Sequence, residues 1–201
     1  MDNSPMWDSI MERIQLGPDQ IPKYRRADIH FVAAGDRPLD ATYDRFAYLV
    51  KLFSDCDYDE TRIREDCPFL VQDVLFNALL CQADRDLAQI ARALSEDSSL
   101  FEQRAEKTAH SMNEKLWDEE HGIYLDFDLT SNRLLEVYVA PNFVSLFAGI
   151  PGEDRAHRMV GTLENTGFAS RMEASRRYRA TTGTASPSFR RGTGGDRSGP
   201  T

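Results

Sequence analysis

The segment FLVQDVLFNALLCQADRDLAQIARAL, residues 69–94, decides the fold class of this chain. Its apolar residues recur with the period of an α-helix that buries one face. They are Leu70, Val74, Leu75, Ala78, Leu79, Leu87, Ile90, Ala91 and Leu94. Residues 82–86 are polar, so the segment is either one long helix or two helices joined by a turn.

Helical patterns continue on both sides of this segment. Helices are predicted near Pro5, from Asp40 as capping residue to Phe53, from Ser98 or Ser99 to Leu116, from Pro141 to Phe147 and from Glu153 to Leu163. Residues 22–38 read as an irregular loop, and residues 122–137 alternate around Ser131-Asn132 as a hairpin does. We find no fixed repeat period, so an all-α domain is favoured over a helical solenoid.

The length and the composition of the chain indicate the class of protein to which it belongs. The 201 residues are enough for one core, and no run is long and apolar enough to cross a membrane. No secretory leader opens the sequence. Cys56, Cys67 and Cys81 lack metal-site spacing and lie in apolar patterns, so we expect buried, reduced thiols and a cytoplasmic protein.

The charge is unevenly distributed along the chain. The net charge is −9, but residues 1–168 carry 17 basic and 31 acidic residues, and only four basic residues of the whole chain are Lys. An acidic, Lys-poor body argues against nucleic acid or an anionic membrane as partner.

The opening residues Met1–Asp8, MDNSPMWD, place an acid before a turn and an aromatic residue after it. Asn3, Ser4 and Pro5 favour a tight loop, from which Asp2 projects near Trp7. A carboxylate beside an aromatic wall is typical of proton donors in sugar-cleaving enzymes, because apolar surroundings raise the acid's pKa. The alternative is a capping Asp with an ordinary buried Trp.

The motif Asp-Asn-Ser-Pro-x-Trp-Asp resembles glycoside hydrolase family 63, in its mannosylglycerate and glucosylglycerate hydrolase branch. The segments KYRRAD (23–28), DRP (36–38), YDRF (43–46) and LWDEEHGIYLDFD (116–128) extend the resemblance. It covers residues 1 to about 168, which it implies are part of the catalytic domain, an (α/α)6 barrel.

The resemblance also implies an activity. The family's inverting α-glycosidases use no cofactor and act on a small carbohydrate, here glucose or mannose linked to an acid such as glycerate. Asp2 matches the general acid, and Asn3 and Trp7 lie beside it in the same motif as candidate substrate-binding residues. Arg37 and Tyr43 match positions that hold the glycerate carboxylate, although Tyr43 could equally be a core aromatic.

The family's general base, a Glu beyond a Trp-Arg-Gly-Pro motif, has no counterpart here. We therefore expect an inactive fragment of a hydrolase. The alternative is a helical sugar-binding or interaction module without catalysis, and the sugar, the aglycone and the oligomeric state stay open.

No metal site is expected. His30, His110, His121 and His157 have no partners at ligand spacing. Asp118, Glu119, Asp126 and Asp128 have the oxygens that a hard cation prefers, but a solvated acidic face is the favoured interpretation.

Residues 169–201 lose apolar periodicity and become rich in Arg, Gly, Ser and Thr, which predicts disorder. We interpret them as an out-of-frame tail rather than a flexible basic one. Codons for residues 191–200, read one base out of register, permit Arg-Tyr-Trp-Arg-Gly-Pro-Val-Trp-Pro. Those for residues 177–182 permit Pro-Ser-Tyr-Asp. Both are motifs that this family carries downstream.

Overall fold

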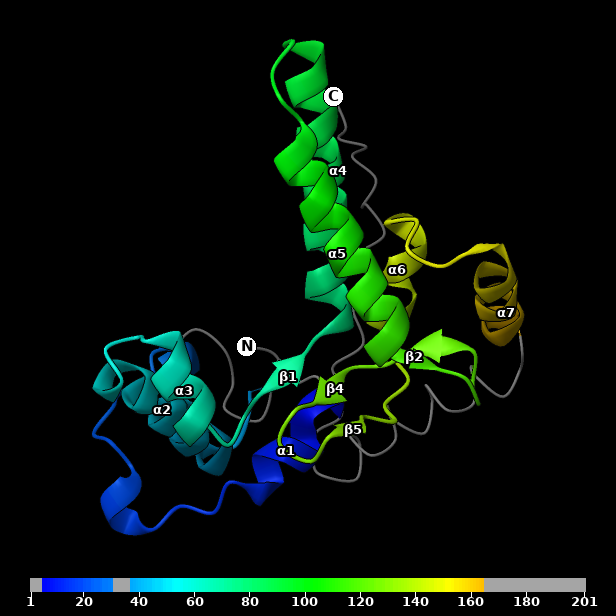
Figure 1. Cartoon of the computed structure of the whole chain (residues 1–201). Helices are drawn as coiled ribbons and strands as arrows, with labels where there is room; N and C mark the ends of the chain where they lie inside the picture. Colours follow the sequence, from blue (N-terminus) through cyan, green and yellow to red (C-terminus); the bar gives the residue numbers. More distant parts are fainter. Residues whose placement is uncertain (1–4, 31–36, 165–201) are drawn as a thin grey trace, which may run out of the picture.

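Two long helices dominate the computed structural model, which describes residues 5–30 and 37–164. They are α4 (Val74–Ala93) and α5 (Ser99–Lys115), which lie side by side and project from the rest of the chain (Figure 1). α4 is continuous, so the two-helix alternative is wrong. Its polar middle does not break the helix because Gln82 donates to Asp86 one turn later, at 2.8 Å, along the exposed surface.

The residues before the three longest helices differ in whether they cap the helix with a side chain. Asp73 caps α4 by accepting the Phe76 amide at 2.5 Å. Ser98, one of the two predicted capping residues, occupies the N-cap position of α5, but its hydroxyl donates to Glu102 at 2.7 Å and does not bond a backbone amide of the first turn. Asp40 is not a cap: it is the first residue of α2 (Asp40–Asp55), after Leu39, and its carboxylate instead accepts a bond from Arg26 at 2.7 Å.

The remaining helical elements are short. They are η1 (Pro5–Trp7), α1 (Asp8–Arg13), η2 (Pro18–Gln20), η3 (Asp28–His30), α3 (Glu60–Asp66), η5 (Ala140–Phe143), α6 (Val144–Phe147) and α7 (Glu153–Glu164). The sequence did not predict α3, which has Ile63 as its one large apolar residue. Its Asp59 cap, which accepts the Arg62 amide at 2.9 Å, stabilises the first turn.

In the described part of the chain, five two-residue strands lie near the base of the long helices (Figure 1). They are β1 (Val71–Gln72), β2 (Trp117–Asp118), β3 (Ile123–Tyr124), β4 (Phe127–Asp128) and β5 (Arg133–Leu134). β4 and β5 form the predicted hairpin, with Phe127 opposite Leu134, and β1 adds to it as a third strand. Asn132 turns the chain with a φ of 55°, a conformation that Asn tolerates well. β3 pairs with β2 instead.

The core has two parts. One joins α4 and α5 to the strands and α7, and the other joins α1 to α2 and α3. The first contains Val74, Ala78, Cys81, Ala105, Met112, Leu116, Tyr124, Ile150 and Met159, and the second Met11, Ile14, Leu49 and Cys67. Cys56, Cys67 and Cys81 are all free and buried, as the sequence predicted.

Within residues 5–30 and 37–164, no helix combines the length and the apolar character needed to span a membrane. The predicted tail, residues 169–201, lies outside the described residues.

Candidate functional site

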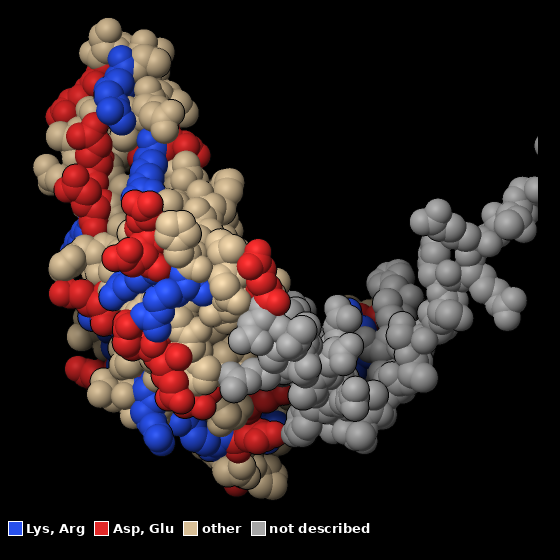
Figure 2. Space-filling model, turned by 90° about the vertical axis from the view of Figure 1, so that its right-hand side faces the viewer, with Lys and Arg blue, Asp and Glu red and all other residues tan. Residues whose placement is uncertain are grey.

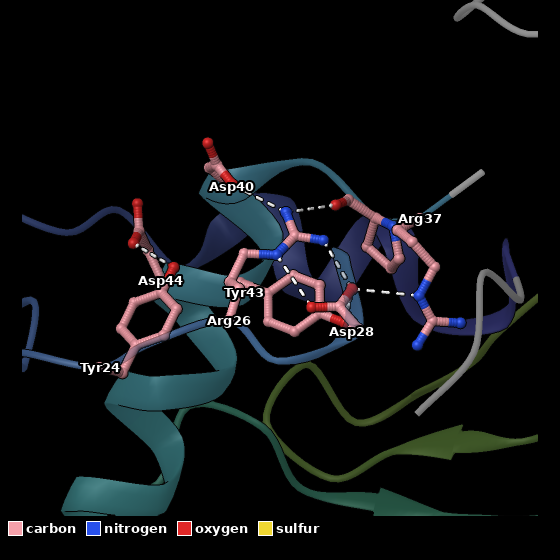
Figure 3. Close-up of polar contacts among 8 residues, drawn as sticks. Tyr24, Arg26, Asp28, Arg37, Asp40, Tyr43 and Asp44 are labelled. Atoms are coloured by element: carbon pink, nitrogen blue, oxygen red, sulfur yellow. Dashed lines mark hydrogen bonds and ion pairs between the residues drawn. The ribbon is translucent and has the colours of Figure 1, made fainter. Parts of the chain in front are cut away.

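The loop before α2 converges on one carboxylate, that of Asp28 (Figure 3). Asp28 accepts two bonds from Arg26, from Nε at 3.2 Å and from Nη2 at 2.8 Å. Its Oδ2 also accepts from Arg37 Nε at 3.1 Å and from the Tyr43 hydroxyl at 2.8 Å. Two of the predicted substrate-binding residues, Arg37 and Tyr43, are therefore brought together by a third residue.

Arg26 fastens this loop to α2. Its Nη1 donates to Asp40 at 2.7 Å and to the Pro38 carbonyl at 3.0 Å. Its guanidinium carbon lies 3.9 Å from the centre of the Tyr43 ring, in cation–π contact. Tyr43 also packs edge-on against Phe46, so it is a packed aromatic as well as a polar contact.

The bonds to Asp28 keep it ionised. The bonds from Arg26, and then those from Tyr43 and Arg37, hold the pKa of Asp28 well below its usual range against the opposing effect of burial. The same pairing raises the pKa of Arg26. Nearby, the Tyr24 hydroxyl donates to Asp44 at 2.9 Å, and burial together with that bond raises the pKa of Tyr24 to about 12.

Arg37 binds Asp28 through one edge of its guanidinium, and it also interacts with Tyr43. Its Nε faces Asp28, and the terminal nitrogens of the guanidinium point away from that carboxylate (Figure 3). The Arg37 side chain is 39 % exposed, whereas Asp28 is 11 % exposed. A guanidinium fixed in this way can present its outer edge to a ligand carboxylate, which it matches with two parallel bonds.

Trp7 is attached at a different place, to residues that flank the strands. Its indole N–H donates to Asp126 Oδ2 at 3.1 Å, and its ring meets Phe69 edge-on with centroids 5.7 Å apart. Asp126 also accepts the Val74 amide at 2.7 Å, at the start of α4. Burial raises the pKa of Asp126 to about 6, although the bonds from Val74 and Trp7 oppose that shift.

Asp128 anchors the same opening segment further along. It is fully buried and accepts bonds from Arg13 at 2.5 Å and from the Ser131 hydroxyl at 2.6 Å. Burial acts to raise the pKa of Asp128, but the bonds from Ser131 and Arg13 outweigh it and lower that pKa. The two carboxylates thus clamp η1 and α1 onto the hairpin.

The solvated acidic face was therefore the wrong interpretation for Asp126 and Asp128. They alternate along the chain with the apolar residues Leu125 and Phe127, so the sequence predicts that their side chains lie on the solvent-facing side of the hairpin. The residues of η1 and α1 that bind them, Trp7 and Arg13, reach that side from more than a hundred residues away. In the described part of the chain, no group of three or more His, Cys, Asp or Glu residues is arranged to hold a metal ion.

Asp2 and Asn3 lie outside the described residues, so the structure gives no position for them. A surface hollow between α5 and α7, lined by Asn113, Glu119, Arg155 and Arg158, contains none of the predicted site residues. Asp28, the centre of the loop, was not among the residues predicted from the sequence to form the site. Its presence in the segment KYRRAD, two residues after Arg26, was the available signal.

A match to a family model shows which family the chain belongs to. Residues 1–197 match the model of the mannosylglycerate hydrolase MGH1-like glycoside hydrolase domain. The chain belongs to this family. The resemblance to glycoside hydrolase family 63 that the opening motif indicated is thereby confirmed.

Relatives in the family have named activities. The chain is 60 % identical over 169 residues to the mannosylglycerate hydrolase of Rubrobacter radiotolerans, covering 84 % of this chain and 38 % of that one. It is 31 % identical over 175 residues to the glucosylglycerate hydrolase of Mycolicibacterium hassiacum, covering 84 % and 38 %. The chain thus spans well under half the length of these relatives.

A solved structure supports the fold. The family 63 mannosylglycerate hydrolase of Thermus thermophilus, in complex with Tris and D-glycerate, superposes with a TM-score of 0.72 at 37 % identity. The match covers 80 % of this chain and 38 % of that one. The predicted fold class is confirmed: a mostly helical part of an (α/α) barrel with a small hairpin.

Proposed function

We propose that this chain is part of an inverting α-glycosidase that hydrolyses a mannosyl or glucosyl bond to glycerate. The observation that carries the proposal is the meeting of Arg37 and Tyr43 at Asp28, in a family whose relatives are named for glycosylglycerate hydrolysis. An Arg held by its Nε edge suits an acidic aglycone. The Thermus relative's structure in complex with D-glycerate supports the same aglycone.

The contacts of Arg37 and Tyr43 indicate that the two residues have different roles. The single hydroxyl hydrogen of Tyr43 is donated to Asp28, so Tyr43 helps to fix the loop. The terminal nitrogens of Arg37 point away from Asp28 (Figure 3). We assign to these nitrogens the two parallel hydrogen bonds that would hold the substrate carboxylate. Asp28 acts through Arg37, as a positioning residue.

In this proposal Asp2 is the general acid that protonates the glycosidic oxygen, with Asn3 and Trp7 bordering the sugar. An inverting mechanism needs a second carboxylate roughly 6.5–9.5 Å away, with a water molecule between the two. We propose that this base belongs to a part of the family domain that residues 1–168 do not include. Consequently the chain alone should not turn over substrate.

The test restores a complete domain. Residues 1–168 replace the matched segment of the Rubrobacter radiotolerans hydrolase, and kcat/KM is measured for mannosylglycerate and for a neutral methyl mannoside. Arg37→Ala should lower kcat/KM for mannosylglycerate by about 10- to 150-fold, the value of a charge-assisted contact worth about 1.5–3 kcal/mol. Arg37→Lys should not restore it, because an ammonium lacks the planar fork.

The neutral substrate distinguishes a variant that has lost its contact with the substrate carboxylate from one that has lost its folded structure. Arg37→Ala should leave its kcat/KM unchanged, since there is no carboxylate to lose. Asp2→Asn should lower kcat for both substrates by about 10²–10⁴-fold, as expected for loss of a general acid. Equal losses on both substrates for Arg37→Ala would make Arg37 a structural residue and end the acidic-aglycone proposal.

A further inference from the structure

A second surface hollow lies between α4 and α5 and contains none of the predicted site residues. Its volume is about 340 Å³, which is enough for a small ligand. We call it the α4–α5 hollow. Apolar and amide side chains form part of its lining, and its charged and hydroxyl-bearing residues are Asp84 of α4 and Arg104, Lys107, Thr108, Ser111 and Lys115 of α5.

One side of α5 supplies most of the polar groups of the hollow. Lys107, Ser111 and Lys115 follow each other at intervals of four residues, so they lie one above the other on the helix. The two Lys backbones are separated by about 12 Å along the axis, with Ser111 between them. Because Lys side chains are long and flexible, both ammonium groups can reach one ligand beside the Ser111 hydroxyl.

Positive charge is concentrated in this hollow although the chain is acidic. The net charge is −9, and two of the four Lys residues of the whole chain line the hollow. Within residues 5–30 and 37–164, neither Lys107 nor Lys115 forms an ion pair, whereas Lys51 pairs with Asp55 at 2.6 Å. On the face of the molecule shown in Figure 2, basic side chains lie next to acidic ones. The two Lys of the hollow lack such a partner in the described part of the chain.

The carboxylate in the hollow is already used by its cationic neighbour on α5. The Asp84 side chain is 3 % exposed, and its Oδ2 lies 3.5 Å from Arg104 Nε. Burial of a carboxylate requires a pairing of this kind. The pair offsets the charge of Arg104, so the charges of Lys107 and Lys115 remain available to a bound anion.

We propose that the α4–α5 hollow binds a phosphate group, either as inorganic phosphate or as part of a small phosphorylated molecule. Lys binds phosphate as a point charge, and the Thr108 and Ser111 hydroxyls can donate to its oxygens. A carboxylate would be matched better by a free guanidinium fork, but Arg104 directs its Nε to Asp84. A phosphate site here would be independent of the proposed glycosidase activity.

The test titrates the full chain with inorganic phosphate in place of chloride, at constant ionic strength. Calorimetry should show saturable binding with a Kd in about the millimolar range, and the amide resonances of residues 107–111 should shift. Lys107→Ala and Lys115→Ala should each weaken binding about tenfold or more, as expected for the loss of a charge-assisted contact. The matched control, Lys51→Ala, removes an exposed Lys of α2 and should bind phosphate as the parent does.

Two further ligands distinguish the sources of the phosphate. Glucose 6-phosphate should bind more tightly than inorganic phosphate if the hollow accepts a phosphorylated molecule, because the sugar can contact Leu80, and no more tightly if it accepts the free ion. Glucose, its neutral counterpart, should leave the resonances of residues 107–111 unchanged.

The variants should fold, because Lys51, Lys107 and Lys115 are all exposed. Circular dichroism checks this, and Lys→Gln at the same positions repeats the comparison for any variant that does not fold. Absence of saturable phosphate binding by the parent chain overturns the proposal. Equal weakening by all three Lys variants does so too, since it would assign the binding to net charge rather than to the hollow.

Discussion

Asp28 links three side chains of the loop before α2 and of α2 itself. Its carboxylate is the common acceptor for Arg26, Arg37 and Tyr43. Asp28→Asn removes the charge and should lower the urea midpoint at pH 7, because the two guanidinium groups lose their counter-ion. Asp19→Asn, at an exposed position, is the matched control.

The sign of the pH dependence follows from the lowered pKa of Asp28. Such a group stabilises the fold above its unfolded pKa of about 4, and the contribution is lost as pH falls through the folded value. The difference in urea midpoint between the parent and Asp28→Asn should therefore be smaller at pH 3 than at pH 7. A difference that does not change with pH would assign the loss to geometry rather than to charge.

Asp126 should make the free energy of unfolding depend on pH in the opposite direction. Burial raises its pKa to about 6, so between about pH 4 and pH 6 the folded chain binds a proton that the unfolded chain releases. Stability should fall as pH rises through that window, by on the order of 2–3 kcal/mol from this group. Asp126→Asn cannot ionise and should lose that part of the slope, as urea unfolding at pH 5 and pH 7.5 would measure. Parallel slopes for the two proteins would contradict the assignment.

At the scale of elements, two side-chain hydrogen bonds, from Trp7 to Asp126 and from Arg13 to Asp128, add to the apolar packing of the opening helix. Trp7→Phe keeps the ring against Phe69 but removes the donor to Asp126. Hydrogen exchange of residues 8–13 should quicken by about one order of magnitude, the effect of one lost hydrogen bond, while α4 and α5 stay protected. The matched control is Trp117→Phe, which loses its bond to Glu119 and should leave residues 8–13 unchanged. Uniform quickening in both variants would mean that the opening helix does not open independently.

At the scale of the whole molecule, the remaining question is the reading frame. We propose that the native frame ends near Phe168. Sequencing the coding DNA should reveal, one base out of register, Tyr-Trp-Arg-Gly-Pro-Val-Trp followed downstream by a Glu. The family model's match continues to residue 197, so the codons are needed to distinguish a shifted frame from a divergent tail. Codons in residues 177–200 that forbid the shifted reading would end the proposal.

The sequence by itself determined what depends on neighbours along the chain. Helical periodicity gave α5 and α7 close to their observed bounds, and alternation around Asn132 gave the hairpin. The motifs at the start of the chain gave the family. The sequence did not predict α3, because a short polar helix with a single large apolar residue has almost no hydrophobic periodicity.

Only the tertiary structure decided which faces are covered. Asp126 and Asp128 alternate with apolar residues as solvated residues do, yet both are buried because a segment more than a hundred residues away covers them. α4 presents apolar residues on two sides, and the packing of its neighbours alone shows that one side is buried and the other exposed. Local pattern fixes the conformation of a segment, but burial is a property of pairs of segments, and those pairs form only when the chain folds.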